Sequence, residues 1–175
     1  MGVEVGRQLV DQRRRALLVP GDPLFASGPA SGRGPDAGQW YLRAPAGEVL
    51  SSVNAEAAWD RITGSADVVV AVLDTGVLAD HLDLSGQVLP GYDMVSDLAT
   101  ANDGDGRDAD ATDPGDWITS AENGARGGDF YDCGAASSSW HGTKIAGIIG
   151  AAANNGQGMA GTAFGVKLLP VRVLG

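Results

Sequence analysis

Two side chains of this 175-residue chain combine a reactive type with a reactive setting: the carboxylate of Asp74 and the imidazole of His141. Asp74 follows an apolar run, residues 68–73 (VVVAVL), whose β-branched composition is typical of a strand buried on both faces of a parallel sheet. Functional sites in open α/β sheets form outside the carboxyl ends of such strands. His141 is followed by residues 144–155, which have the composition of a helix that packs closely on a sheet. Together the two side chains could transfer protons, whereas separately they would serve as a turn cap and a core histidine.

Three kinds of enzyme place an aspartate directly after an apolar strand. Retroviral-type aspartic proteases have a D-T-G sequence there and pair two such aspartates across a dimer. Ion-pumping ATPases form an aspartyl phosphate, but they require a lysine where Thr75 stands. The third kind is the subtilisin-like serine protease, and residues 70–77 (VAVLDTGV) resemble its catalytic-aspartate strand at every position.

His141 distinguishes these possibilities. Residues 141–150 (HGTKIAGIIG) resemble the H-G-T-H-V-A-G motif of subtilisin-like proteases, and an aspartic protease has no use for that histidine. Two later blocks, residues 158–163 and 167–175, resemble the family's G-V-A-P-x-A and K-x-x-V-R-V-L segments. The order of aspartate before histidine is also that of the family. Lys144 departs from the motif because it replaces a second histidine, and a cation one helical turn from His141 disfavours the imidazolium.

The resemblance implies a three-layer, subtilisin-like α/β fold with a mainly parallel sheet, of which this chain would form the N-terminal half. It implies a serine endopeptidase that cuts protein or peptide substrates, with His141 as general base and Asp74 as the group that orients it. The family's catalytic serine lies in a G-T-S-M-A-x-P motif, which does not occur here, and its oxyanion-hole asparagine lies further along than Gly175. The missing C-terminal half of the peptidase domain would therefore be a partner. The alternative is a non-catalytic calcium-binding pseudoprotease, or a truncated fragment.

A long acidic stretch separates the two motifs. Residues 93–132 hold 11 of the 22 acidic residues, and long irregular segments of this kind are usually functional or disordered. Carboxylates spaced by glycine and other small residues suit a hard cation such as Ca²⁺. The candidate ligands are Asp103, Asp105, Asp108, Asp110 and Asp113. Arg107 stands at the fifth position of what would be an EF-hand loop, so the pattern is not an EF-hand, and the alternative is a solvated acidic loop. The stretch also resembles an insertion in bacterial extracellular subtilisin-like proteases, and secreted members of the family commonly hold calcium.

The composition of the chain limits which binding partners and which cellular location are expected for it. A formal charge of −10 and an isoelectric point near 4.4 argue against nucleic acid and against an anionic membrane surface. No apolar run is long enough to span a bilayer. Residues 1–15 lack the pattern of a signal peptide, so secretion is an expectation that rests on the family resemblance. Cys133 is the single cysteine, and paired cysteines in the bacterial subgroup imply a partner thiol beyond Gly175.

The chain is expected to divide near residue 38. Residues 1–38 are interpreted as a propeptide remnant and linker, cleaved between Leu17 and Asp22, because residues 20–38 are rich in proline, glycine and serine. Residues 39–175 would form the N-terminal part of the peptidase domain. Within it, Asn54 is predicted to cap a helix over residues 55–63, and residues 167–174 to form a second strand.

Overall fold

A computed structural model describes residues 19–27, 38–47 and 50–175 of the chain. Most of the predicted propeptide remnant, including Leu17, lies outside these described residues. Within the described ranges the regular elements are α1 (Pro23–Ser27), η1 (Trp40–Leu42), α2 (Ala55–Trp59), β1 (Val69–Asp74), η2 (Leu82–Leu84), β2 (Tyr92–Asp93), α3 (Leu98–Ala101), α4 (Ser120–Gly124), α5 (His141–Gly150) and β3 (Lys167–Arg172).

The strands form a three-stranded sheet in the order β1-β3-β2, and both pairings are parallel. β1 pairs with β3 so that Val69 lies opposite Lys167 and Asp74 lies opposite Arg172. The chain leaves β1, passes through α5 and returns as β3, which is the crossover that parallel strands require. The α/β class predicted from the sequence is therefore confirmed, as are the strand that leads to Asp74 and the helix that begins at His141.

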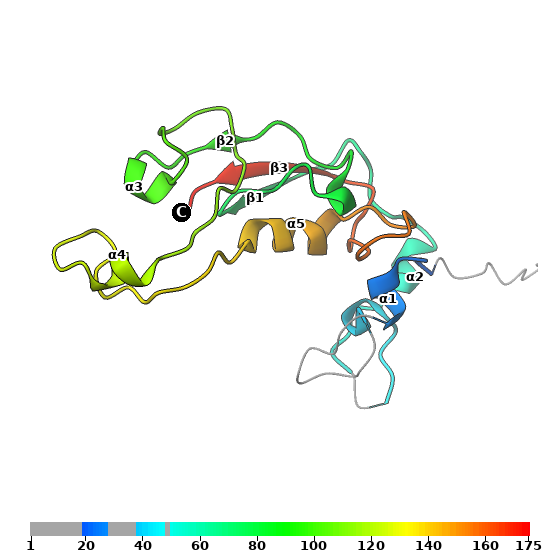
Figure 1. Ribbon diagram of the computed structural model, residues 1–175. Helices are drawn as coiled ribbons and strands as arrows, with labels where there is room; N and C mark the ends of the chain where they lie inside the picture. The colour runs from blue at the N-terminus through cyan, green and yellow to red at the C-terminus, as the bar shows by residue number, and fades with distance from the viewer. Residues whose placement is uncertain (1–18, 28–37, 48–49) are drawn as a thin grey trace, which may run out of the picture.

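Helix α5 covers one face of the sheet, on the lower side in Figure 1. The core between them contains Val72 and Leu168 from the strands and Ala146 from the helix, all almost fully buried. Gly150 lies so close to the side chain of Leu168 that an added Cβ would fall 3.2 Å from it. Small residues in α5 thus let the helix approach the sheet, as its composition predicts.

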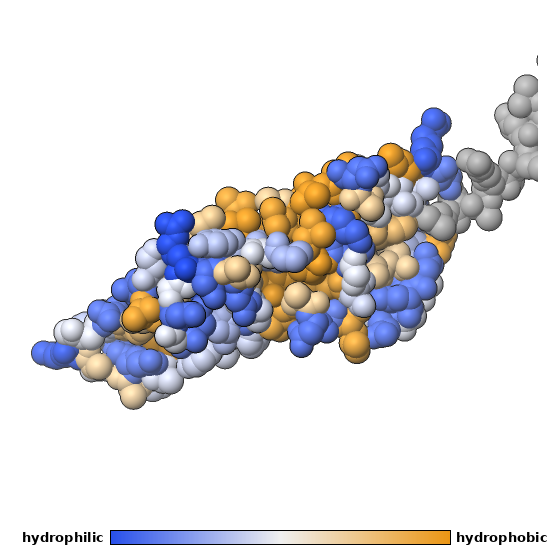
Figure 2. All heavy atoms as spheres, turned by 90° about the horizontal axis from the view of Figure 1, so that it is seen from above, coloured by the Kyte–Doolittle hydropathy of each residue, from blue (hydrophilic) through white to orange (hydrophobic). Residues whose placement is uncertain are grey.

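The opposite face of the sheet is open. The sequence predicts a strand buried on both faces, but Val69 and Leu73 of β1 are 49% and 62% exposed. Seen from the side away from α5, hydrophobic residues gather across the middle of the molecule (Figure 2). The prediction of two-sided burial is wrong for the described residues because they include no layer that covers this face.

The N-terminal described segment does not behave as a linker. Residues 23–27 form α1, and Phe25 is 2% exposed in a second core with Leu42 and Trp59. Asp22, at 1% exposure, accepts hydrogen bonds from the N–H groups of Asn154 and Asn155 at 2.8 and 3.1 Å. Proline and glycine content predicted an extended conformation, but the apolar side chain of Phe25 and the buried carboxylate hold this part against the body.

Helix α2 differs from its prediction at both ends. Asn54 has a left-handed backbone (φ 56°) and its side chain makes no capping hydrogen bond, and the helix ends at Trp59 rather than near residue 63. The indole N–H of Trp59 donates to the carbonyl of Thr162 at 2.9 Å, so tertiary packing fixes this end. Within the described ranges, no helix has both the length and the apolar character that crossing a bilayer requires.

Candidate active site

Asp74 and His141, 67 residues apart in the sequence, meet where β1 ends and α5 begins. The imidazole Nδ1 of His141 lies 2.9 and 2.8 Å from the two carboxylate oxygens of Asp74. The Asp74 side chain is 11% exposed, whereas that of His141 is 58% exposed. A carboxylate on Nδ1 holds the ring proton on that nitrogen and leaves Nε2 free to accept a proton from another molecule. The arrangement can therefore perform general acid–base chemistry at the outer edge of the ring.

The neighbours of Asp74 fix its carboxylate. The N–H of Thr75 donates to Asp74 Oδ1 at 2.8 Å, and the carbonyl of Asp74 accepts the N–H of Val173 at 2.8 Å. The bond from Thr75 holds the Asp74 side chain in place. The bond from Val173 continues the pairing of β1 with β3 at Asp74 itself. The acid is thus part of the sheet rather than of a free loop.

Thr75 joins the strand to the helix, a role the sequence analysis did not identify. Its hydroxyl accepts the N–H of Gly142 at 3.1 Å and donates to Asp113 Oδ2 at 2.7 Å. Asp113 is 2% exposed and also accepts the N–H of Gly115 at 2.9 Å. The structure therefore turns Asp113, one of the five predicted cation ligands, inward to these hydrogen-bond donors. The physical reason is that a buried carboxylate needs hydrogen-bond donors, and Thr75 and Gly115 supply them.

Gly142 lies in close contact with the end of β1 and the residues that follow it. A Cβ added to it would overlap the carbonyl oxygen of Gly76 and would come within 3.1 Å of Asp74 Cβ. We predict that Gly142→Ala lowers the free energy of unfolding by about 1–3 kcal/mol, because the helix must move away from the strand. Urea denaturation of the chain measures this loss.

Gly124 supplies the matched control for that prediction. It also lies in a helix, α4, but nothing is within 4 Å of its Cβ position. Gly124→Ala is expected to leave stability unchanged or to raise it slightly, since alanine is the better helix former. Equal effects of the two substitutions would contradict the close packing at Gly142.

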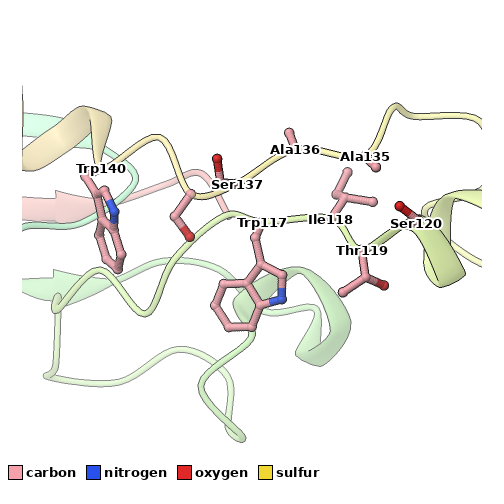
Figure 3. Close-up of a pocket in the computed structure, with 9 residues that line it drawn as sticks. Trp117, Ile118, Thr119, Ser120, Ala135, Ala136, Ser137 and Trp140 are labelled. Carbon is pink, nitrogen blue, oxygen red and sulfur yellow. The ribbon is translucent and has the colours of Figure 1, made fainter.

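A hollow of about 830 Å³ lies beside the histidine. Two neighbouring segments line it, residues 117–120 on one side and residues 135–138 with Trp140 on the other, and they are bridged by the antiparallel pair Ile118 and Ala136. Figure 3 shows Trp117 and Trp140, one from each segment, with Trp140 next to the start of α5. This excursion carries α4 and projects beyond the end of the sheet (Figure 1). The surface next to His141 is therefore built from residues that lie between the two motifs. We call residues 78–140 the inserted stretch.

The other four predicted cation ligands lie together at the surface. A second hollow, of about 370 Å³, is lined by Asp103, Asp105, Asp108, Asp110, Thr112 and Pro114. The negative charge of Asp108 raises the pKa of Asp105. Asp108 Oδ1 accepts the N–H of Asp110 at 2.8 Å, so part of the carboxylate set bonds its own loop. In the part of the chain that the structure describes, no three His, Cys, Asp or Glu side chains are arranged to hold a metal ion.

Arg172 connects this acidic hollow to the sheet. It is fully buried at the end of β3, and its Nη1 lies 2.5 Å from both Asp93 Oδ2 and Asp103 Oδ2. Its Nη2 donates to the carbonyl of Ala101. In the sequence, Arg172 stands out only as one position of the block of residues 167–175 that resembles a family segment. The signal that could have indicated a special role is an arginine that directly follows the apolar run of residues 168–171.

Two further reactive side chains have simpler surroundings. His81 Nδ1 accepts the N–H of Asp83 at 3.2 Å and caps η2. The thiol of Cys133 is exposed and makes no disulfide in this chain. Its predicted partner beyond Gly175 stays a prediction.

Known proteins match this chain along most of its length. The family model described as "Subtilase family" matches residues 65–175. An extracellular protease of Xanthomonas campestris pv. campestris is 45% identical over 95% of this chain. An extracellular basic protease of Dichelobacter nodosus is 47% identical over 95% of this chain. The chain spans 25% and 24% of the lengths of these two curated relatives.

A solved structure agrees with these matches. A protease from Pseudoalteromonas arctica PAMC 21717 superimposes with a TM-score of 0.71 and 48% sequence identity, covering 90% of this chain and 39% of that one. The parallel sheet with α5 on one face is thus an incomplete, subtilisin-like α/β fold, as the sequence motifs predicted. With a family model that matches well over half of its residues and two relatives above 40% identity, the chain belongs to the subtilase family.

Proposed function

We propose that this chain supplies the aspartate and histidine of an Asp–His–Ser triad in a serine-type endopeptidase. The observation that carries the proposal is the contact of His141 Nδ1 with both oxygens of Asp74, at the strand end and helix start of a subtilase. The serine and the oxyanion donor would come from the remaining length of the domain, which the relatives have and this chain does not cover. We call this chain, continued by that serine-bearing part, the extended peptidase.

The proposed mechanism is nucleophilic acyl transfer to water. A serine hydroxyl is a weak nucleophile, so Nε2 of His141 would accept its proton as the oxygen attacks the peptide carbonyl. Asp74 would keep the ring in the tautomer with the proton on Nδ1 and would stabilise the imidazolium that forms. His141 would then donate the proton from Nε2 to the leaving amine. A water molecule would release the acyl group by the same sequence of proton transfers.

The exposed face of the sheet supports the proposed partner. Val69 and Leu73 of β1 are too exposed for residues of a mainly apolar strand, and the continuation of the peptidase domain would bury them. Protein or peptide chains are the proposed substrates. We also propose that the extended peptidase acts outside the cell, because the two relatives are named as extracellular proteases.

Peptide hydrolysis by the extended peptidase tests the proposal. Activity that is lost when His141 or Asp74 is replaced supports it. The alternative is a non-catalytic pseudoprotease or truncated fragment. It predicts no hydrolysis by the wild-type protein, even with the serine-bearing part present.

Calcium is the second element of the proposal. The donor set of the acidic hollow is chemically suited to a hard cation, and the mutual repulsion that raises the pKa of Asp105 would be relieved by one. Asp105, Asp108 and Asp110 are not arranged around an ion in the structure and would have to move together to hold it. Asp103 pairs with Arg172 and Asp113 faces inward, so we do not assign these two as the main ligands.

Adding about 1 mM Ca²⁺ is expected to raise the melting temperature of the chain by about 3–6 °C, because an ion that binds only the folded state stabilises it. Differential scanning calorimetry with and without the ion measures this rise. Asp105→Asn combined with Asp108→Asn should abolish it, whereas Asp129→Asn, at an exposed aspartate outside the hollow, should not. An unchanged melting temperature in wild-type chain and extended peptidase would favour the solvated loop.

A further inference from the structure

The backbone of the proposed base is held in an unusual way. Trp140, the residue before α5, has a left-handed backbone with φ 52°, which is uncommon for a bulky side chain. It provides no side-chain hydrogen bond to the helix start. The N–H of His141 instead donates to the hydroxyl of Ser139 at 3.2 Å. The place where the helix begins therefore depends on what holds Ser139.

Asp116 holds Ser139 from across the inserted stretch. Its Oδ1 accepts the N–H of Ser139 at 2.5 Å, a contact between residues 23 apart in the sequence. Burial raises the pKa of Asp116, but hydrogen bonds from the side chain and N–H of Ser139, with the nearby charge of His141, outweigh burial and lower it overall. Asp116 is therefore an anionic, half-buried anchor beside the histidine.

The segment that carries Asp116 is itself braced. The N–H of Gly115 donates to the buried Asp113 at 2.9 Å, and the amide of Asn102 donates to the carbonyl of Gly115 at 3.0 Å. Gly115 has φ +106°, and a Cβ there would meet Ser138 Oγ at 2.5 Å. Residues 115 and 116 thus fit tightly against the segment that leads into α5, with support from the body on their other side.

We propose that Asp116 is a positioning residue for the Asp74–His141 pair. By accepting the N–H of Ser139 it sets where α5 begins, and so where the imidazole of His141 meets the carboxylate of Asp74. This inference rests on the proposed function and deepens it, because it explains how an insertion between the two motifs takes part in the site. Asp116 does not touch the reacting atoms and acts through Ser139.

Proton NMR of the chain itself tests the positioning. A proton held between an imidazole Nδ1 and a carboxylate is strongly deshielded, and the chain has two histidines. His81 uses Nδ1 to accept the N–H of Asp83, so a deshielded Nδ1 proton reports on His141. We expect Asp116→Ala and Ser139→Ala to broaden or remove this signal. Asp116→Asn should retain it, because the amide oxygen still accepts the N–H of Ser139.

Glu122 provides a matched control on the same inserted stretch. Its carboxylate also accepts an N–H and a hydroxyl, from Thr119 at 2.8 and 2.6 Å, but it caps α4. Glu122→Ala should leave the deshielded proton unchanged while lowering the melting temperature at least as much as Asp116→Ala. If Asp116→Ala fails to fold, Ser139→Ala and Asp116→Asn decide the matter by the same signal.

An intact signal in Asp116→Ala or Ser139→Ala would overturn the positioning role, and so would equal loss in Asp116→Asn and Asp116→Ala. Absence of the signal from the wild-type chain would contradict the Asp74–His141 contact on which the proposed function also depends. In the extended peptidase, Asp116→Ala should lower kcat about 10- to 100-fold with KM unchanged, as expected for a misplaced base. The NMR result needs no serine, so it stands whether or not the chain takes part in proteolysis.

Discussion

Replacing His141 by alanine in the extended peptidase is expected to lower kcat by about 10⁴- to 10⁶-fold, with little change in KM. The ring is the only group in the proposed site that would accept the serine proton, and alanine leaves that proton without an acceptor. Asp74→Asn is expected to cost about 10⁴-fold, because an amide at this place favours the wrong ring tautomer. Initial rates on a peptide substrate measure both losses, and circular dichroism shows whether the fold is retained.

His81 is the matched control, since it is the other histidine of the chain and serves as a cap for η2. His81→Ala should leave kcat within about twofold of wild type while lowering stability modestly, as loss of a helix cap does. A His141→Ala enzyme that keeps activity within tenfold of wild type would remove the histidine from the proposed triad. Inactive wild-type protein would instead favour the pseudoprotease alternative.

Replacing Arg172 by methionine is expected to lower the free energy of unfolding of the chain by about 3–5 kcal/mol. The substitution keeps most of the side-chain volume but leaves the fully buried Asp93 without its cation. Asp93 retains a hydrogen bond from the N–H of Val95 at 2.6 Å, which does not replace an ion pair. Asp103, at the surface hollow, loses the same partner. Urea denaturation followed by circular dichroism gives the change directly.

Arg107 offers the matched control, because it is an exposed arginine in the same acidic stretch. Arg107→Met should change stability by no more than about 0.5 kcal/mol. If the loss at Arg172 arises from an unpaired buried carboxylate, the double substitution Arg172→Met with Asp93→Leu should recover much of it. A loss below about 1 kcal/mol for Arg172→Met would show that the buried ion pair adds little net stability.

The candidate site could be predicted because Asp74 and His141 lie at the ends of a strand and a helix that the local sequence pattern indicates. The apolar run before Asp74 indicates a strand without knowledge of its neighbours, and the glycines and alanines after His141 indicate a helix that approaches a sheet closely. A strand end and a helix start on the same side of a parallel sheet are brought together by the crossover itself. The contact between the two residues is therefore an outcome of the fold class.

The supporting residues could not be predicted in the same way. Asp113 and Asp116 look alike in the sequence, as two members of an acidic stretch, yet one is buried under Thr75 and the other holds Ser139. Asp103 and Arg172 are 69 residues apart, and their pairing depends on β3 lying between β1 and β2. The docking of Phe25 on Trp59 likewise overrides a composition typical of a linker.

The sequence by itself determined the residue types at the reactive ends, the strand and helix that carry them, and the family motifs around them. Those features depend on periodicity and on neighbours a few residues away, which a single sequence displays. Only the tertiary structure decided which acidic side chains face the surface, which are buried as hydrogen-bond acceptors, and which one braces the start of α5. Those choices depend on long-range packing, where each carboxylate turns to the donors that the fold brings within reach.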